Sequence, residues 1–307
     1  MPGIRVVNFY IHNTGPGCSD SDRPCVGFDD NKYANQLDFE DSSQGADGVQ
    51  LINNTVKWCG GHNCLQVHHD TGNVVVEGNK VGPGCVHSCI DVKGIGRPEA
   101  PAVVSFNTAT CGESAELCGC EVNHTCGKAQ NPAFYTENVY SPSEVVTFYG
   151  NVAYDTGIGF QDCRGGCSND SGCAMDVNYY NNTVYIARTI PNSYGLYADI
   201  TCAGPASSGP QRITLRNNIF DGASNYSVFV GTGFSAVSED YNNIGGMQGS
   251  PGFKINGSAR KGPHDLSNVD PRYVNVAAHD FRLLHGSPCI DAGLTMLTDG
   301  LRNLGAY

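Results

Sequence analysis

Charged and imidazole side chains occur at alternate positions in four short stretches of the first half of the chain. These stretches are NQLDFED (35–41), CLQVHHD (64–70), CIDVKG (89–94) and CGCEVNH (118–124). In each, apolar residues alternate with polar ones, which is typical of a β-strand that buries one face and presents the other to solvent. The outward polar positions are, in chain order, Asp38, Glu40, Gln66, His68, Asp91, Lys93, Glu121 and Asn123.

The carboxyl groups of this set predict a calcium site. On neighbouring strands, outward side chains lie about 5 Å apart at Cβ, so Asp91 and Glu121 would repel each other. Lys93 supplies a single positive charge, whereas calcium, with about six to eight oxygen ligands, would balance the rest. The alternative is a solvated group of charges, partly paired with Lys93 and the histidines. The expected calcium ligands are Asp38, Glu40, Asp91 and Glu121.

Lys93 is the first candidate for a catalytic base. It follows Asp91 by two residues, so both side chains emerge on one face, about 6–7 Å apart. A lysine must be neutral to remove a proton, and a nearby calcium would favour that form, whereas bare carboxylates oppose it. Arg97, in the following loop, is expected to hold a second carboxylate or to assist a departing oxygen. His68 and His124 are alternative bases, because the pKa of histidine lies nearest to neutrality.

The same outward face continues into the later stretches IGFQDC (158–163), GLYADI (195–200) and SVFVGT (227–232). Inward-pointing Ile158 and Phe160 would place Gln161 in line with Lys93 and Asn123. A different use of this face is an aromatic strip for stacking sugars, formed by Tyr197, Phe229 and Tyr185. The expected substrate-binding residues are Gln66, Asn123, Gln161 and Tyr197.

A short strand that ends in asparagine recurs along the chain, for example in LINNTV (51–56), TFYGNVA (147–153) and TLRNNIF (214–220). A fixed strand–Asn–strand unit at variable spacing predicts an all-β solenoid, a parallel β-helix of roughly eight coils that stack to bury a common core. An asparagine at each corner can adopt the left-handed conformation and bond its amide to the next along the axis. These asparagines are Asn54, Asn79, Asn107, Asn151, Asn182, Asn218 and Asn243.

The C-terminal stretch NVDPRYVNVAAHDFRLLHGSPCIDAG (268–293), followed by NLGAY (303–307), resembles the ending of bacterial right-handed β-helix proteins of the pectate-lyase-like superfamily. The resemblance implies a single right-handed parallel β-helix domain over residues 1–307, with residues 268–307 as a C-terminal cap. In lyases of this superfamily, calcium on acidic side chains binds a uronate carboxylate and a nearby lysine or arginine removes the C5 proton. The acidic cluster around Asp91 and Lys93 is similar in design, so the leading expectation is calcium-assisted β-elimination of a uronate-containing polysaccharide.

Two other functions stay open, because this superfamily holds several activities on one fold. The first is a glycoside hydrolase with Asp91 and Glu121 as acid and base. The second is a non-catalytic solenoid for carbohydrate binding or adhesion. The chain lacks the arginine-rich signature of pectate lyases and the Asp-Pro-His pattern of mannuronan epimerases. The expected partner in all three cases is an acidic or neutral polysaccharide.

Composition limits the partners further. The formal charge is −12 and no basic stretch exists, which argues against nucleic acid as a partner. Fifteen cysteines favour an oxidising compartment with several disulfides, and hence a secreted, extracellular protein. No apolar run approaches the length of a membrane span. Composition leaves the oligomeric state open.

Overall fold

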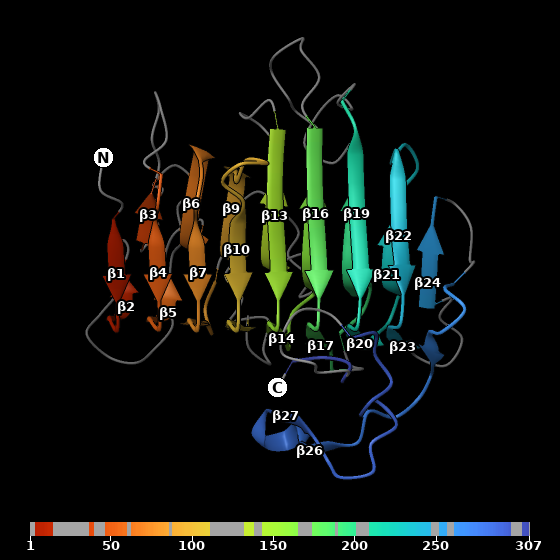
Figure 1. The fold of residues 1–307 in the computed structure, drawn as a ribbon. Coiled ribbons are helices and arrows are strands. Elements are labelled where there is room, and N and C mark those ends of the chain that lie inside the picture. The colour runs from red at the N-terminus through yellow and green to blue at the C-terminus, as the bar shows by residue number, and fades with distance from the viewer. Residues whose placement is uncertain are drawn as a thin grey trace.

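The computed structural model describes residues 4–14, 37–39, 47–59, 63–85, 88–110, 132–137, 143–164, 174–187, 190–200, 209–246, 252–256, 261–295 and 303–306. These residues form three parallel sheets, A, B and C, to which successive strands along the chain contribute in turn (Figure 1). Each circuit of three strands is one coil, and sheets A and C each hold eight strands. The predicted fold class, an all-β parallel β-helix of about eight coils, is confirmed.

The strands of the three sheets are short and their bounds are as follows. Sheet A consists of β1 (Arg5–Val7), β4 (Gln50–Ile52), β7 (Val75–Glu77), β10 (Ala102–Ser105), β13 (Ser143–Tyr149), β16 (Ala174–Tyr180), β19 (Gln211–Arg216) and β22 (Ala236–Asp240). Sheet B consists of β2 (Tyr10–Thr14), β5 (Thr55–Cys59), β8 (Lys80–Val81), β11 (Thr108–Thr110), β14 (Val152–Tyr154), β17 (Thr183–Tyr185), β20 (Ile219–Ala223), β23 (Asn243–Gly246) and β25 (Leu266–Ser267). Sheet C consists of β3 (Leu37–Phe39), β6 (Asn63–Thr71), β9 (Ser88–Ile95), β12 (Pro132–Glu137), β15 (Ile158–Cys163), β18 (Tyr194–Asp199), β21 (Tyr226–Val230) and β24 (Gly252–Ile255).

The corner between sheets A and B is a two-residue turn in every coil, and its first residue has a positive φ between 54° and 67°. Asparagine and glycine adopt this left-handed conformation at the lowest cost, which explains their recurrence there. In the second to seventh coils the left-handed residue is the one before the asparagine singled out from the sequence. The eight left-handed residues are Asn8, Asn53, Gly78, Phe106, Gly150, Asn181, Asn217 and Tyr241.

The second corner residue is a buried asparagine from the second coil onward, and these side chains form a continuous amide ladder. Each Nδ2 donates to the Oδ1 of the next asparagine at 2.9–3.0 Å and to a main-chain carbonyl of the previous coil. Each backbone N–H donates to the same Oδ1. The predicted ladder is confirmed, except that its eighth-coil member is Asn242 rather than Asn243.

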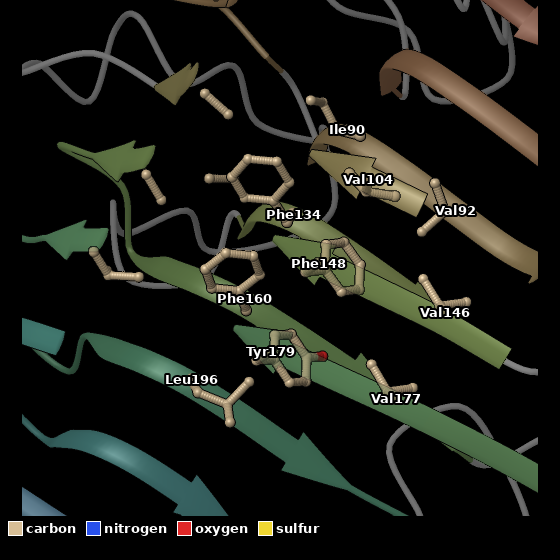
Figure 2. Close-up of a cluster of buried hydrophobic side chains, with 14 of the residues drawn as sticks. Ile90, Val92, Val104, Phe134, Val146, Phe148, Phe160, Val177, Tyr179 and Leu196 are labelled. Carbon is tan, nitrogen blue, oxygen red and sulfur yellow. The ribbon is translucent and has the colours of Figure 1, made fainter. Parts of the chain in front are cut away.

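The interior is filled by inward side chains of all three sheets, mostly valine, isoleucine and leucine. The fourth to sixth coils hold a block of four aromatic rings instead (Figure 2). Phe134 stacks on Phe160 with ring centroids 4.8 Å apart, and Phe148 stacks on Tyr179 at 5.1 Å. The two stacks meet edge to face, for example Phe148 with Phe160 at 5.5 Å. This block lies directly behind the middle strands of sheet C.

The described residues of the C-terminal segment, 268–295 and 303–306, lie along the outer face of sheet B (Figure 1). It contains a short antiparallel pair, β26 (Tyr273–Asn275) and β27 (Asp280–Leu283), joined by the 3₁₀ helix η1 (Val276–Ala278). Tyr273 and Phe281 pack against Tyr185, and the side chain of Asn217 donates to the carbonyl of Leu294 at 2.8 Å. No helix among the described residues is long and apolar enough to cross a membrane.

Two carboxyl groups meet where the ladder ends. Asp265 Oδ1 accepts from the backbone N–H of Asn242 at 2.7 Å, and Glu239 Oε2 accepts from the Asn242 side chain at 3.4 Å. Burial, with the hydrogen bond and charge of Asp265, raises the pKa of Glu239 to about 8. The folded chain therefore holds a proton on Glu239 in the pH range where an unfolded chain has released it.

Because the folded state has the higher pKa, the stability that this proton confers is fully present below the ordinary pKa of glutamate and declines as the pH rises toward 8. We expect the Tm of the protein to fall between about pH 5 and pH 8, and the Glu239→Gln variant, which resembles the protonated acid, to show a flatter profile. Calorimetry at several pH values measures this, with Glu77→Gln, an exposed acid on β7, as the control. Equal slopes for Glu239→Gln and the wild type would refute the assignment.

Candidate functional site on the outer face of sheet C

The register of sheet C sorts its outward side chains into two columns along the solenoid axis. In five strands a first-column side chain contacts the second-column side chain two residues later, as Tyr135 contacts Glu137. The first column comprises Asp38, Gln66, Asp91, Tyr135, Gln161, Tyr197, Phe229 and Lys254. The second column comprises His68, Lys93, Glu137, Cys163 and Asp199.

The fourth coil differs from the sequence-based expectation. Its sheet C strand is β12 (Pro132–Glu137), so Tyr135 and Glu137 occupy the places at which Glu121 and Asn123 were expected. The stretch PAFYTE also alternates inward and outward residues, and that signal was overlooked because CGCEVNH alternates as well. The structure describes Asp38 through its backbone alone. The expected site residues outside the described part of the chain are Glu40, Glu121, Asn123 and His124.

Gln161 also lies in a different column from the one expected. It occupies the first column, between Tyr135 and Tyr197, rather than the second. The shift arises because Phe160, and not Ile158, aligns with the first inward position of the neighbouring strands. Gln161 therefore lies on the line that leads from the charged cluster toward the later aromatic residues.

This shift places the carboxylate of Asp162 inside the solenoid, which the alternation of apolar residues does not predict. Arg164 is fully buried beside it and donates two hydrogen bonds to its carboxylate, at 2.8 and 2.6 Å. Arg164 also donates to the carbonyls of Met175 and Arg212, and Tyr179 donates to Asp162 at 3.3 Å. A buried charge is tolerated when it is paired and hydrogen-bonded in this way.

Lys93 lies between two carboxylates at the centre of the site. Its Nζ is 3.4 Å from Asp91 Oδ2 and 3.4 Å from Glu137 Oε2, and 5.0 Å from the centroid of the Tyr135 ring. The Tyr135 hydroxyl donates to the same Glu137 Oε2 at 3.0 Å. Glu137 keeps 12% of its side chain exposed, and its Oε1 has no hydrogen-bond partner among the described residues.

The pKa values of Lys93 and Glu137 are both raised, which opposes base catalysis by the lysine and favours acid catalysis by the glutamate. Burial acts to lower the pKa of Lys93, but the carboxylates of Asp91 and Glu137 outweigh it, and the pKa is raised. Lys93 is therefore protonated at neutral pH, and the geometry does not support it as a proton-abstracting base. Burial raises the pKa of Glu137, although Lys93 and Tyr135 act against it. Glu137 thus has the environment of a general acid.

His68 lies beside Lys93 in the second column, and its two ring nitrogens face Gln66 and Asp91. The Gln66 amide donates to His68 Nδ1 at 3.0 Å, and His68 Nε2 lies 3.8 Å from Asp91 Oδ2. An amide donor on Nδ1 places the proton of a neutral ring on Nε2, facing the carboxylate. Asp91 itself is fully buried and accepts from the Asn63 amide at 2.7 Å. This arrangement suits His68 as a support for Asp91 better than as a base.

Calcium stays a prediction. Within the described residues, no group of three or more His, Cys, Asp or Glu side chains could hold a metal ion. The Asp91 carboxylate is contacted by the Lys93 ammonium and the Asn63 amide, which are donors rather than metal ligands. These described contacts do not fit calcium at Asp91, and the chemistry proposed below is not routed through a metal.

Beyond Gln161 the same face carries four half-buried rings, which we call the aromatic strip: Tyr194, Tyr197, Tyr226 and Phe229. Tyr197 stacks on Phe229 with centroids 5.1 Å apart and planes 8° apart. The Tyr197 hydroxyl donates to Asp199 at 3.1 Å, and Lys254 Nζ lies 5.4 Å from the Phe229 ring. Flat, partly exposed rings flanked by hydrogen-bonding groups suit the apolar faces of sugar rings.

Tyr185 and Arg97 do not belong to this surface. Tyr185 lies on sheet B, where it packs against Tyr273 and Phe281 of the C-terminal segment, so its expected place in the strip is wrong. Arg97 lies past the end of β9 and pairs with Asp47 at 2.6 Å. Its guanidinium thereby links two turns of the chain, and we leave it out of the proposed site.

Comparison with known proteins adds no family to this description. No family model matches the chain, and no curated protein matches it. The resemblance of residues 268–293 to the pectate-lyase-like superfamily therefore stays an expectation, and the function is argued from the site.

Proposed function

We propose that this protein is a secreted polysaccharide-active enzyme that holds a glycan along the outer face of sheet C and hydrolyses it. The observation that carries the proposal is a partly exposed acid, Glu137, with a raised pKa, on the same face as the aromatic strip. The cluster of Asp91, Lys93 and Glu137 has no excess of positive charge, which favours a neutral glycan at the point of cleavage.

Glu137 is the proposed general acid. Its Oε1 gives a proton to the glycosidic oxygen as the bond to the sugar breaks. The carboxylate that remains is then stabilised by the Lys93 ammonium and the Tyr135 hydroxyl, which both contact Oε2. These two groups are in place before the reaction, so the charge develops where donors already lie.

Asp199 is the proposed base that activates water. It lies in the same column as Glu137, two strands along the axis, with Cys163 between them. Two strand spacings amount to about 9.6 Å at the backbone. Inverting glycosidases separate their carboxyl groups by about 6.5–9.5 Å and retaining ones by about 5–5.5 Å. This backbone spacing is much nearer to the inverting range than to the retaining one, and on that ground we propose inversion at the anomeric carbon.

Elimination is the second candidate, because Lys93 is a cation that a uronate carboxylate would contact. The two reactions have different products. We expect the wild-type protein, incubated with neutral and acidic polysaccharides, to release reducing ends without the ultraviolet absorbance of a conjugated double bond. Absorbance that grows with each new end, above all if a calcium chelator abolishes it, would overturn hydrolysis in favour of calcium-assisted elimination.

Binding to the aromatic strip is tested separately. Tyr197→Ala removes the ring that stacks on Phe229, and we expect it to weaken binding of the hydrolysed polymer by roughly 5- to 10-fold. Retardation of the protein in gels that contain the polymer measures this. Tyr180→Ala, a half-buried tyrosine on sheet A, is the matched control and should bind like the wild type. Equal losses in both variants would refute the strip as the binding surface.

Disulfides support the proposal that the protein is secreted. Cys85 forms a disulfide with Cys89, and Cys64 and Cys163 are also disulfide-bonded. Cys289 is a buried free thiol. Several disulfides are expected in a protein that folds in an oxidising compartment.

A further inference from the structure

A chain of buried polar side chains leads to Asp91, the carboxylate that contacts Lys93. The Ser88 hydroxyl donates to Asn63 Oδ1, and the Asn63 amide donates to Gln66 Oε1 and, at 2.7 Å, to Asp91 Oδ2. Ser88, Asn63 and Asp91 are fully buried and come from the adjacent strands β6 and β9. The Asn63 amide thus reaches the carboxylate that holds Lys93.

We propose that Asn63 is a positioning residue that acts on the acid Glu137 through Asp91 and Lys93. The inference rests on the proposed function for the role of Glu137, and on the described contacts for the connection itself. A fully buried carboxylate stays ionised only where donors compensate the loss of water, and the Asn63 amide is such a donor. Ionised Asp91 then shares the Lys93 ammonium with Glu137 at equal distances of 3.4 Å.

The direction of the effect follows from the charges. Without the Asn63 donor, Asp91 is a poorer anion and becomes protonated at a higher pH. Lys93 is then left to Glu137 alone, and the repulsion from the Asp91 charge disappears. Burial is the main cause that raises the pKa of Glu137, with Asp91 adding to it and Lys93 opposing it. Loss of the Asn63 amide therefore lowers the pKa of Glu137.

The test uses three variants of the full chain. Asn63→Leu removes the donor while keeping a similar volume. Ser88→Ala leaves Asn63 in place but removes the hydroxyl that donates to it. This variant tests the same connection if Asn63→Leu does not fold. Ser227→Ala is the matched control, because Ser227 is a fully buried serine of sheet C whose Oγ has no hydrogen-bond partner among the described residues.

NMR titration of the Glu137 carboxyl carbon measures whether Asn63 affects the pKa of Glu137. It needs no substrate, so it is independent of the proposed activity. We expect the Glu137 titration to move down by about half a pH unit or more in Asn63→Leu, less in Ser88→Ala, and not in Ser227→Ala. The alkaline limb of the hydrolysis profile should move with it, which a merely structural role would not produce. An unchanged or raised Glu137 titration in the folded variants overturns the inference, while a moved titration without hydrolysis overturns only the proposed function.

Discussion

Glu137→Gln is expected to lower the rate of glycan hydrolysis by about 100- to 10,000-fold, the usual worth of a positioned general acid. Glutamine keeps the shape of the side chain and accepts the hydrogen bond from Tyr135, but it has no proton to give to the leaving oxygen. Lys93 retains Asp91 as a partner, so the free energy of unfolding should change by less than about 1 kcal/mol. Reducing-end assays and urea unfolding on the same preparations measure both quantities.

Asp176→Asn is the matched control for this variant. Asp176 is a carboxylate on the outer face of sheet A, paired with Arg212 at 3.5 Å. Its replacement removes an equal charge from a different face and should leave hydrolysis unchanged. Hydrolysis by Glu137→Gln at the wild-type rate would show that Glu137 is not the general acid, even if the polymer still binds.

Asn151→Leu is expected to lower the free energy of unfolding by about 3 kcal/mol or more. The Asn151 side chain accepts from the backbone and side chain of Asn107 and donates to Asn182 and to the Val104 carbonyl. All of these groups are buried, so a leucine leaves donors and an acceptor without partners in the middle of the stack.

Urea unfolding followed by circular dichroism measures this loss. Asn178→Ala is the control, because Asn178 lies outward on sheet A, half-buried, and accepts one hydrogen bond from Tyr180. We expect that variant to lose less than about 1 kcal/mol. Similar losses in the two variants would mean that the ladder adds nothing beyond an ordinary polar contact.

The fold was predictable from the sequence because its two determinants are local. The recurring asparagine marks a corner whose geometry is the same in each coil, and the alternation of apolar residues marks the strands between corners. The number of residues between successive corner asparagines is not informative, because insertions at the other corners change it without disturbing the stacking of the coils. For the first three coils, the alternation pattern therefore predicted that Gln66 lies beside Asp91 and His68 beside Lys93, as the structure has them.

The site was predictable only in part, because its fourth coil depends on which of two alternating stretches enters the sheet. CGCEVNH and PAFYTE both satisfy the pattern, and the choice is made by packing, since Phe134 completes the aromatic block with Phe160. The prediction for the fifth coil was wrong for a different reason. A carboxylate at an inward position is unfavourable unless it is paired. The sequence alone does not show that Arg164, two residues later, also turns inward and pairs with Asp162.

The central claim is that the glycan binds along the outer face of sheet C. Hydroxyl-radical footprinting of the Glu137→Gln variant tests it most directly, because side chains covered by a bound glycan are oxidised more slowly. With an oligosaccharide of the polymer that the wild type hydrolyses, we expect Tyr197 and Phe229 to be labelled several-fold more slowly than in the free protein. Phe106 and Tyr149, which lie at the corner and on the outer face of sheet A, should be labelled at the same rate in both states. Protection of Phe106 and Tyr149 with no protection of Tyr197 and Phe229 would contradict the account and move the glycan to another face.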